Sequence, residues 1–385
     1  MNKNLTPFEE IRRKRAKKKL LKKTVSISLL SLVLMFVFYA YKNNYYVKLI
    51  NSIDGIFTVL KKGSGYPIEI NATAIKSKSK IGNELLILDE DIVYIFNRYG
   101  YKTLYAKHGL NNPRVISNNN KSVIFEQLGK KLQIYSKTYK LFEKELNTPI
   151  YNMAISNSGK IAVIRGSNRF LSTIEIWNEL YENIFTWNSA EKYVTSVAFS
   201  PNNKDFVAAA IETQGVEYIS TINFFNINRD EKIAVAELKN EMIISIKYEN
   251  NNVYVISDKN AYIFNNKAKL KYQYAYNGKV LNTYNNDLHK YMVLIFDNYN
   301  WLENNNLVVL DYMAKPIGEC KVKGKIKDID SIDRRICLLT DESVKVFDLT
   351  AKMIGTYNVS NDINNIICTP NRLYKLNISE IDIVK

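Results

Sequence analysis

Short runs of alternating hydrophobic and polar residues fill the chain from about residue 72 onward. Turns that contain Asn, Ser or Gly separate these runs, and convincing helical periodicity is almost absent. Alternation places successive side chains on opposite faces of a strand, whereas an amphipathic helix shows a period near 3.6 residues. This part of the chain is therefore predicted to be all-β.

One motif recurs through this region: an apolar residue, any residue, an apolar residue and a bulky residue, usually followed by Asn, Asp or Ser. Successive bulky positions are separated by 39, 42, 48, 39, 46, 37 and 37 residues. The mean of about 41 residues lies in the range of four-stranded propeller blades. The eight bulky positions are Phe96, Tyr135, Trp177, Phe225, Phe264, Leu310, Phe347 and Val384.

Each copy of the motif is expected to be the third strand of a blade. A second strand precedes every copy, and a first strand precedes that one, as at Tyr151–Ile155 and Val194–Phe199; runs such as KTLYAKHG supply the fourth. These strands predict an eight-bladed β-propeller, with seven blades and an extra hairpin as the alternative. Because the chain stops just after a third strand, we expect GYPIEI (Gly65–Ile70) to complete the last blade and close the ring.

The N-terminal region has a different pattern, an uncharged apolar segment from Thr24 to Tyr41. As a helix it measures about 27 Å, close to the thickness of a bilayer core. A cleaved signal peptide is the alternative, but bulky rings stand where small residues are needed for cleavage. We therefore expect a basic tail at 1–23, a transmembrane helix at 24–41, a stalk at 42–64 and a WD40-like propeller at 65–385.

The net charge of +16 is unevenly distributed, since the first 23 residues hold ten basic and two acidic residues, half of the excess. Basic residues beside a span keep that side in the cytoplasm. The protein is thus expected to be a single-pass cell-membrane protein with a cytoplasmic N-terminus and an extracellular propeller. Nucleic-acid binding is not expected, because no reader fold accompanies the basic run. The basic residues expected to contact anionic lipid are Arg12, Arg13, Lys14, Arg15, Lys17, Lys18, Lys19, Lys22 and Lys23.

Two segments resemble parts of WD40 blades. Val194–Ala210 resembles the first two strands, and Val344–Lys352 resembles the third strand and the turn after it, although most repeats lack the Gly-His and Trp-Asp signatures. As a whole, the basic tail, single span, GYPIEI segment and degenerate propeller resemble a family of uncharacterised bacterial single-span propeller proteins. The resemblance implies membrane anchorage and an extracytoplasmic propeller, and it implies no known activity or site.

The residues that usually carry catalysis or bind metals do not form a recognisable motif. His108 and His289 have no Cys or His at ligand spacing, and KDIDSID, with Asp328, Asp330 and Asp333, lacks the EF-hand glycine and glutamate. Alternating acids on a strand explain this last motif better than calcium does. No nucleophile elbow or phosphate-binding loop is present. We therefore expect no catalytic residue, metal site or cofactor, and a protein that is not an enzyme.

The three cysteines, Cys320, Cys337 and Cys368, are odd in number and have no C-x-x-C spacing. They lie in or beside predicted blade strands. We therefore expect buried apolar side chains, and the sequence supports no specific disulfide among them.

The leading functional hypothesis is a non-enzymatic module that displays the loops of the propeller to an envelope protein or an anionic envelope polymer. A hydrolase or lyase with a site at the central channel and a transmembrane sensor are the alternatives. The insertions ETQGVEY and DNYNWLENNN are the first candidates for partner contact, with aromatic anchors at Tyr218, Tyr299 and Trp301. These rings would otherwise only cap a blade edge.

Overall fold

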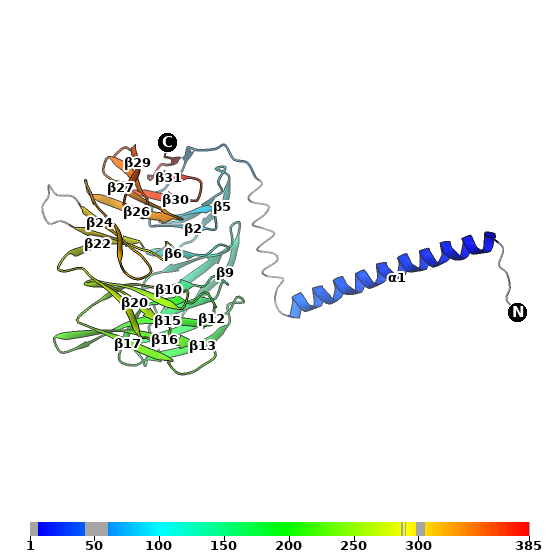
Figure 1. Cartoon of the computed structure of the whole chain (residues 1–385), viewed down its shortest axis with the longest axis horizontal. Coiled ribbons are helices and arrows are strands. Elements are labelled where there is room, and N and C mark those ends of the chain that lie inside the picture. Colours follow the sequence, from blue (N-terminus) through cyan, green and yellow to red (C-terminus); the bar gives the residue numbers. More distant parts are fainter. Residues whose placement is uncertain (1–6, 43–60, 286–287, 289, 298–304, 385) are drawn as a thin grey trace. The chain divides into compact units, whose positions relative to one another are not determined.

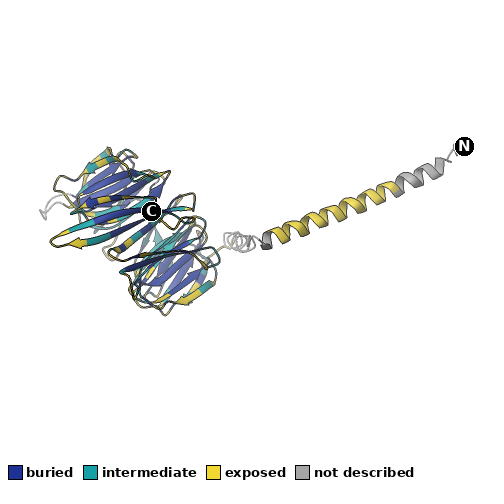
Figure 2. Ribbon diagram, turned by 90° about the horizontal axis from the view of Figure 1, so that it is seen from below, coloured by how far each residue is buried: buried dark blue, intermediate teal, exposed yellow. Residues whose placement is uncertain are grey.

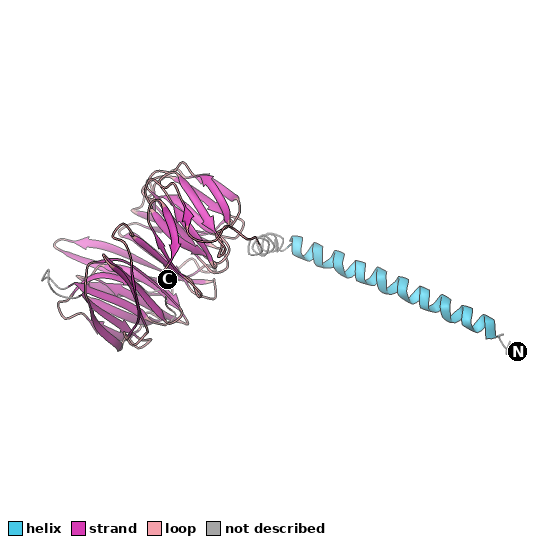
Figure 3. Cartoon of the chain, turned by 90° about the horizontal axis from the view of Figure 1, so that it is seen from above, coloured by secondary structure: helices cyan, strands magenta, loops and turns pink. Residues whose placement is uncertain are grey.

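The computed structural model describes residues 7–42, 61–285, 288, 290–297 and 305–384, with helical side chains from residue 17 to 39. The chain forms two compact units, Met1–Phe57 and Thr58–Lys385. The first unit contains a helix and the second consists of strands joined by turns (Figure 3).

A single helix, α1 (Pro7–Lys42), runs through the basic tail and the apolar segment. It begins at Pro7, as expected of a residue whose missing N–H is harmless in the first helical turn. Good helix formers such as Ala and Lys join the basic tail to the apolar segment in this helix without a break. The stretch Lys17–Tyr39 is long and apolar enough to cross a membrane, as anchors and signal sequences both are. Its side chains are exposed (Figure 2).

The second unit is an eight-bladed β-propeller, which confirms the predicted fold class. Its strands form eight four-stranded antiparallel sheets. Figure 1 shows the blades in chain order from cyan to red, with the red last blade beside the cyan first blade. The alternative of seven blades and an extra hairpin is therefore wrong.

The strands of the first four blades are as follows. Blade 1 contains β2 (Ser77–Ile81), β3 (Glu84–Leu88), β4 (Ile92–Phe96) and β5 (Lys102–Lys107); blade 2 contains β6 (Pro113–Ser117), β7 (Ser122–Glu126), β8 (Lys131–Tyr135) and β9 (Lys140–Glu145). Blade 3 contains β10 (Ile150–Ile155), β11 (Ile161–Arg165), β12 (Ser172–Trp177) and β13 (Asn183–Ser189); blade 4 contains β14 (Tyr193–Phe199), β15 (Asp205–Gln214), β16 (Glu217–Asn226) and β17 (Ala234–Lys239).

The remaining blades follow the same plan. Blade 5 contains β18 (Ile243–Glu249), β19 (Asn252–Ser257), β20 (Asn260–Asn265) and β21 (Leu270–Ala275); blade 6 contains β22 (Val280–Asn285), β23 (Met292–Asp297), β24 (Asn305–Leu310) and β25 (Pro316–Val322). Blade 7 contains β26 (Ile326–Ile332), β27 (Arg335–Thr340), β28 (Ser343–Phe347) and β29 (Met353–Asn358); blade 8 contains β30 (Asn365–Cys368), β31 (Leu373–Leu376), β32 (Glu380–Ile383) and β1 (Ile68–Glu69).

The segment before blade 1 closes the ring as predicted. In β1, Ile68 pairs with Ile381 and Glu69 with Glu380 of β32. The third strand of blade 8 ends at Ile383, one residue before the predicted Val384, whose N–H still bonds to the Leu373 carbonyl at 2.9 Å. Closure leaves no blade with a missing outer strand.

The core of the propeller lies between blades. Eight hydrophobic clusters occur among the described residues, and each joins one blade to the next. The cluster that contains Ile87, Tyr94, Ile367 and Ile381 joins blade 8 to blade 1. Second and third strands are buried on both faces, shown in dark blue in Figure 2, because each is packed between two neighbouring blades.

The Asn, Asp or Ser that follows the bulky position has a structural role in blades 1 to 7, which explains why the motif repeats. In blade 7, Asp348 Oδ1 accepts hydrogen bonds from the N–H groups of Thr350 at 2.8 Å and Lys352 at 3.0 Å. Asn265 Oδ1 accepts equivalent bonds, both at 2.9 Å, from Lys267 and Lys269 in blade 5. The side chain thus caps the tight turn between the third and fourth strands.

The insertion ETQGVEY is not a separate loop as expected. It extends β15 and β16 into a hairpin of two ten-residue strands, in which Thr213 pairs with Tyr218 and Gln214 with Glu217. The turn at Gly215 has a φ of 66°, a conformation that glycine adopts without steric cost. The second insertion, DNYNWLENNN, falls largely on residues 298–304, outside the described residues.

Candidate functional site

Three arginines from three blades meet on one face of the propeller. Turns between first and second strands, and between third and fourth strands, open on the same face because the strands are antiparallel. We call this the entry face, because Gly65, at the start of the propeller, donates its N–H to the Tyr99 carbonyl there at 3.2 Å. Arg335 begins β27, Arg372 precedes β31, and Arg98 follows β4.

The three guanidinium groups bind neutral oxygens. Arg335 Nη2 donates to the carbonyls of Thr369 at 3.1 Å and Pro370 at 2.5 Å, and Arg372 Nη1 donates to the Arg98 carbonyl at 2.5 Å. Arg98 Nη2 donates to the Tyr99 hydroxyl at 2.7 Å. Within the described part of the chain, none of these arginines has a carboxylate partner within 4.0 Å. Their positive charge is therefore available to a ligand.

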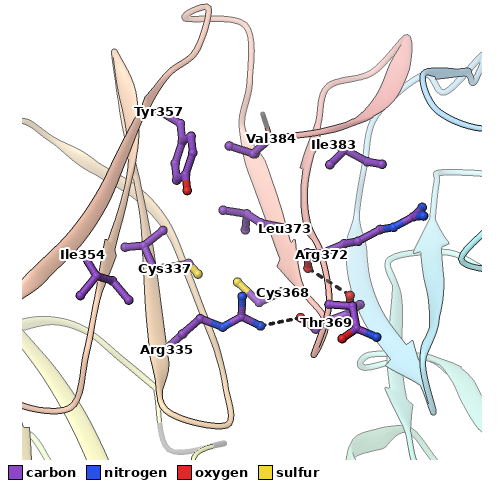
Figure 4. Close-up of a pocket in the computed structure, with 12 residues that line it drawn as sticks. Arg335, Cys337, Ile354, Tyr357, Cys368, Thr369, Arg372, Leu373, Ile383 and Val384 are labelled. Carbon is purple, nitrogen blue, oxygen red and sulfur yellow. Dashed lines mark hydrogen bonds between the residues drawn. The ribbon is translucent and has the colours of Figure 1, made fainter.

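Two adjoining cavities lie at this cluster. The first, of about 270 Å³, lies between blades 7 and 8 and is drawn in Figure 4. The second, of about 250 Å³, lies between blades 8 and 1. Both are lined by Thr369, Asn371 and Arg372 of the turn between β30 and β31. We refer to the two cavities with their three arginines as the arginine pocket.

Each arginine occupies a distinct part of the arginine pocket. Arg335 projects into the first cavity, toward Thr369 and Cys368 (Figure 4). Arg98 lines the second cavity and is exposed, whereas Arg335 and Arg372 are half-buried. Guanidinium groups and the Asn371 amide are donors that suit phosphate or carboxylate oxygens, whereas the Thr369 hydroxyl already donates to the Arg372 carbonyl at 3.0 Å.

The tyrosines beside the arginine pocket do not add negative charge at neutral pH. Tyr66 and Tyr374 have ring centroids 5.0 Å apart, and the Tyr66 hydroxyl donates to the Asn97 carbonyl at 3.0 Å. Burial raises the pKa of both phenols, and Arg372 only partly opposes this rise. Both rings therefore stay protonated, and the pocket keeps its positive charge.

Two Lys–Asp ion pairs, here called the charge ladder, lie next to the arginine pocket and join the first strands of blades 1 and 7. Lys80 Nζ lies 3.0 Å from Asp330 Oδ1, and Lys78 pairs with Asp328. The carboxylates accept the N–H groups of Ile366 and Cys368, both at 2.7 Å, on the otherwise unpaired edge of β30. Two ion pairs between blade 1 and blade 7 thus hold the inner strand of blade 8 in place. The lysines are Lys78 and Lys80 of blade 1, and the aspartates are Asp328 and Asp330 of blade 7.

The acidic motif at 328–333 therefore has a structural role. Asp328 and Asp330 alternate on β26 as predicted, while Asp333 lies in the following turn with a φ of 54°. Burial raises the pKa of Asp328, and Lys78 partly offsets this rise. Among the described residues, no group of three His, Cys, Asp or Glu side chains is arranged to hold a metal ion.

The residues singled out in the sequence lie elsewhere. Tyr218 is half-buried in β16, and its hydroxyl lies 3.5 Å from Asp258 Oδ2 of blade 5, so it bridges two blades. Tyr299 and Trp301 fall outside the described residues. Lys17, Lys18, Lys19, Lys22 and Lys23 are exposed on α1, and Arg12, Arg13, Lys14 and Arg15 lie in α1 with side chains that are not described. Their predicted contacts with a partner and with lipid stay predictions.

Of the two histidines, His108 lies among the described residues and has a structural role. His108 is buried in the connection between β5 and β6, where Nδ1 accepts the Leu110 N–H at 3.0 Å and Nε2 lies 3.2 Å from the Asp89 carbonyl. Burial lowers the pKa of His108, so it is neutral and holds this connection in place. His289 lies outside the described residues.

Sequence reasoning missed the arginine pocket. Its members stand apart in the sequence, at FNRYG, DRRIC and PNRLY, and ring closure brings Arg98 of blade 1 to the two arginines of blades 7 and 8. A signal was nevertheless present, because each arginine occurs in or next to an Asn- or Asp-containing turn, and these turns open on the same face of the propeller.

The fold is similar to that of several solved structures. The computationally designed Ika8 protein matches with a TM-score of 0.64 and 11% identity over 82% of this chain and 97% of that one. The C-terminal WD40 domain of Sif2 matches with a TM-score of 0.60 and 14% identity, over 82% of this chain and 96% of that one. BamB from Moraxella catarrhalis matches with a TM-score of 0.53 and 12% identity, over 84% of this chain and 100% of that one. At these identities the likeness shows a propeller fold alone.

Comparison with known sequences places the whole propeller in one family. A search of curated proteins gives no match. A family model matches residues 53–385, which include every blade of the propeller. The chain therefore belongs to DUF5711, a family of unknown function.

Proposed function

We propose that this protein is a membrane-tethered, non-enzymatic binding module whose propeller recognises anionic groups at the arginine pocket. The observation that carries the proposal is the convergence of Arg98, Arg335 and Arg372 around one turn with neutral partners only, among the described residues. The ligand class is an envelope polymer that bears phosphate or carboxylate groups. An acidic segment of an envelope protein offers the same carboxylates and is the competing ligand.

The rigidity of the scaffold supports a binding role. The turns that carry the arginines are anchored in sheets buried on both faces, so the donors keep their relative positions. Preorganised donors lose little entropy when they bind an anion. The ionisable groups of the neighbouring charge ladder already bind one another and the edge of β30, which supports a structural role more than a chemical one.

The N-terminal helix supports tethering. Its apolar stretch has the length of a bilayer span, and the basic residues stand on its N-terminal side. In the proposed topology the tail stays in the cytoplasm and the propeller lies outside the cell membrane. The tail then contacts anionic lipid, while the arginine pocket faces the envelope.

Binding of the full-length protein in lipid nanodiscs to polyglycerol phosphate, polyglutamate and neutral dextran tests the proposal. All variants carry Gln at the nine basic tail residues named above, so that the tail contributes little to binding of the anionic probes. We expect polyglycerol phosphate to bind, and its affinity to fall as salt screens the arginines. Preference for polyglutamate would instead favour an acidic protein segment.

The double variant Arg98→Gln/Arg335→Gln is expected to lose at least about tenfold in affinity, since two charge-assisted contacts are removed. Arg229→Gln, which removes one exposed charge from the turn of blade 4, is the control and should change affinity less than about twofold. Binding that is insensitive to salt, or equal losses in both variants, would contradict the proposal. Turnover of a polymer during the assay would favour the enzyme alternative.

A further inference from the structure

Two cysteines from neighbouring blades face each other beside the arginine pocket. Cys337 lies on β27 of blade 7 and Cys368 ends β30 of blade 8. Both are free thiols, 3% and 2% exposed, and both line the first cavity. Figure 4 shows their sulfur atoms pointing toward one another across the boundary between blades 7 and 8.

The backbone holds this pair in place. Cys337 is directly opposite Asp330 in the pairing of β26 with β27, and Asp330 Oδ2 accepts the Cys368 N–H at 2.7 Å. One carboxylate therefore connects the strand pair that carries Cys337 to the strand that ends with Cys368. The side chains of Val346 and Ile366 belong to the same hydrophobic cluster as both cysteines.

The third cysteine is separate. Cys320 lies on β25 of blade 6 and lines a different cavity, with Lys279 and Glu319. The fold therefore selects one pair out of the three that three cysteines allow. This selection is invisible in the sequence, where the two partners are 31 residues apart and share no motif.

We propose that Cys337 and Cys368 are an oxidation site at which a disulfide bond links blade 7 to the closing blade. The co-reactant is a low-molecular-weight disulfide. The thiolate of one cysteine attacks a sulfur of the oxidant, forms a mixed disulfide and releases one thiol. The second thiolate attacks the protein sulfur of that mixed disulfide and releases the other thiol. The protein loses two electrons and two protons, and the oxidant becomes two thiols.

The location gives the bond a structural consequence. Blade 8 is completed by β1, which contributes only two residue pairs, so the closing blade has the shortest outer strand of the ring. A disulfide bond from Cys368 to Cys337 restrains the inner strand of that blade. Because a cross-link limits the unfolded chain, the oxidised protein should resist unfolding more than the reduced protein.

Burial sets the conditions for the reaction. A hydrogen bond with Cys337 and burial both raise the pKa of the Cys368 thiol, so the folded protein holds little thiolate at neutral pH. Exchange in the folded state should therefore be slow and should accelerate in mildly alkaline solution. The cavity of about 270 Å³ that both cysteines line provides an approach for the oxidant.

Thiol mapping of the full-length protein in detergent tests the proposal. The protein is incubated with oxidised glutathione at mildly alkaline pH, denatured in N-ethylmaleimide and digested for mass spectrometry. We expect a cross-linked peptide pair that contains Cys337 and Cys368 and an alkylated Cys320. Alkylation of both Cys337 and Cys368, or a cross-link that includes Cys320, would overturn the proposal.

Thermal unfolding supplies a second measurement. Oxidation is expected to raise the unfolding midpoint by about 5 °C, and dithiothreitol should reverse the rise. The matched variant Cys320→Ser should keep the full rise, whereas Cys337→Ser and Cys368→Ser should lose it. If a variant fails to fold, the comparison of oxidised with reduced Cys320→Ser protein still decides the question. Equal midpoints in that comparison would overturn the proposal.

Discussion

The absence of one side chain lets blades 6 and 7 approach closely at Gly318. A Cβ atom at this position of β25 would lie 2.2 Å from the carbonyl carbon of Thr350 and 2.5 Å from the amide nitrogen of Ala351. Backbone atoms in a packed turn do not move aside for an added methyl group. Gly318 is therefore required by packing, although it stands in the middle of a strand, where glycine is usually unfavourable.

We expect Gly318→Ala to lower the free energy of unfolding by about 3 kcal/mol, because the added methyl group overpacks the contact between the blades. Denaturation of the full-length protein by urea measures this loss. Gly355→Ala is the matched control, since Gly355 holds the equivalent position in β29 of blade 7. The three atoms nearest to its Cβ would belong to the Tyr357 side chain, at 3.1–3.4 Å. A loss below about 1 kcal/mol is expected there, and similar losses in both variants would contradict this explanation.

At the scale of single residues, the sequence indicated a role wherever the side chain contacts the backbone of its own turn. The polar residue after each bulky position could be recognised because Asn, Asp and Ser cap turns through local contacts, as Asp348 does. Gly318 and the facing thiols of Cys337 and Cys368 could not be recognised. Their roles depend on how closely they approach atoms of another blade, and no local sequence pattern indicates which residues of two blades will be neighbours.

Among the elements, the strand β30 is bonded at its inner edge by side chains of both neighbouring blades. It is four residues long, and its inner edge is bonded by Asp330 of blade 7 and Lys80 of blade 1. An unpaired strand edge is a liability in a sheet, and charged side chains from both sides cover this one. The pair is partly buried, with side-chain exposures of 26% for Lys80 and 10% for Asp330.

A double-mutant cycle with Lys80→Met and Asp330→Asn is expected to give a coupling energy of about 1–3 kcal/mol, because removing one partner leaves the other charge poorly solvated. Asn at position 330 keeps an oxygen for the Cys368 N–H. The control cycle uses Lys76 and Glu90, an exposed pair 3.2 Å apart. Its coupling should stay below about 0.5 kcal/mol. Equal coupling in both cycles would show that the partly buried position of the Lys80–Asp330 pair does not matter.

Most second and third strands could be predicted as short apolar runs between polar turns, since burial between two blades imposes apolar residues on both faces. The hairpin of β15 and β16 was the exception. Polar and charged residues such as Glu212 and Gln214 suggested a loop, but backbone pairing with the facing strand continues through them. The buried residues of the two strands fix their pairing register. The exposed residues at the tip of the hairpin continue in this register, although their sequence has no hydrophobic pattern.

At the scale of the whole molecule, the junction between the last and first blades determines whether the ring closes. Ile381 of β32 is fully buried in the cluster shared by blades 8 and 1, and it pairs with Ile68. Closure could be predicted from the sequence because eight third strands were present and the last blade needed a partner. The arginine pocket could not, since Arg98 and Arg372 become neighbours only after that closure.

Ile381→Ala is expected to destabilise the propeller by about 2–5 kcal/mol, because it leaves a cavity at the closing junction. Ile378→Ala, three residues earlier, is the control: Ile378 is 54% exposed, and its truncation should cost less than about 1 kcal/mol. Limited proteolysis should cut blade 8 faster in the first variant than in the second. Uniform protection of blade 8 in both variants would show that this residue does not hold the ring closed.

The pairing of β1 with β32 also sets an order of assembly. The segment at 68–69 is synthesised before all the other strands, while its partner at 380–383 is synthesised after them. Blades 1 to 7 can therefore form as the chain lengthens, but the ring cannot close until β32 is available. Until then the backbone N–H and C=O groups of β1 have no partner strand. A segment of two pairing residues offers little edge to a wrong partner during this interval, so its shortness protects the growing chain from misassembly.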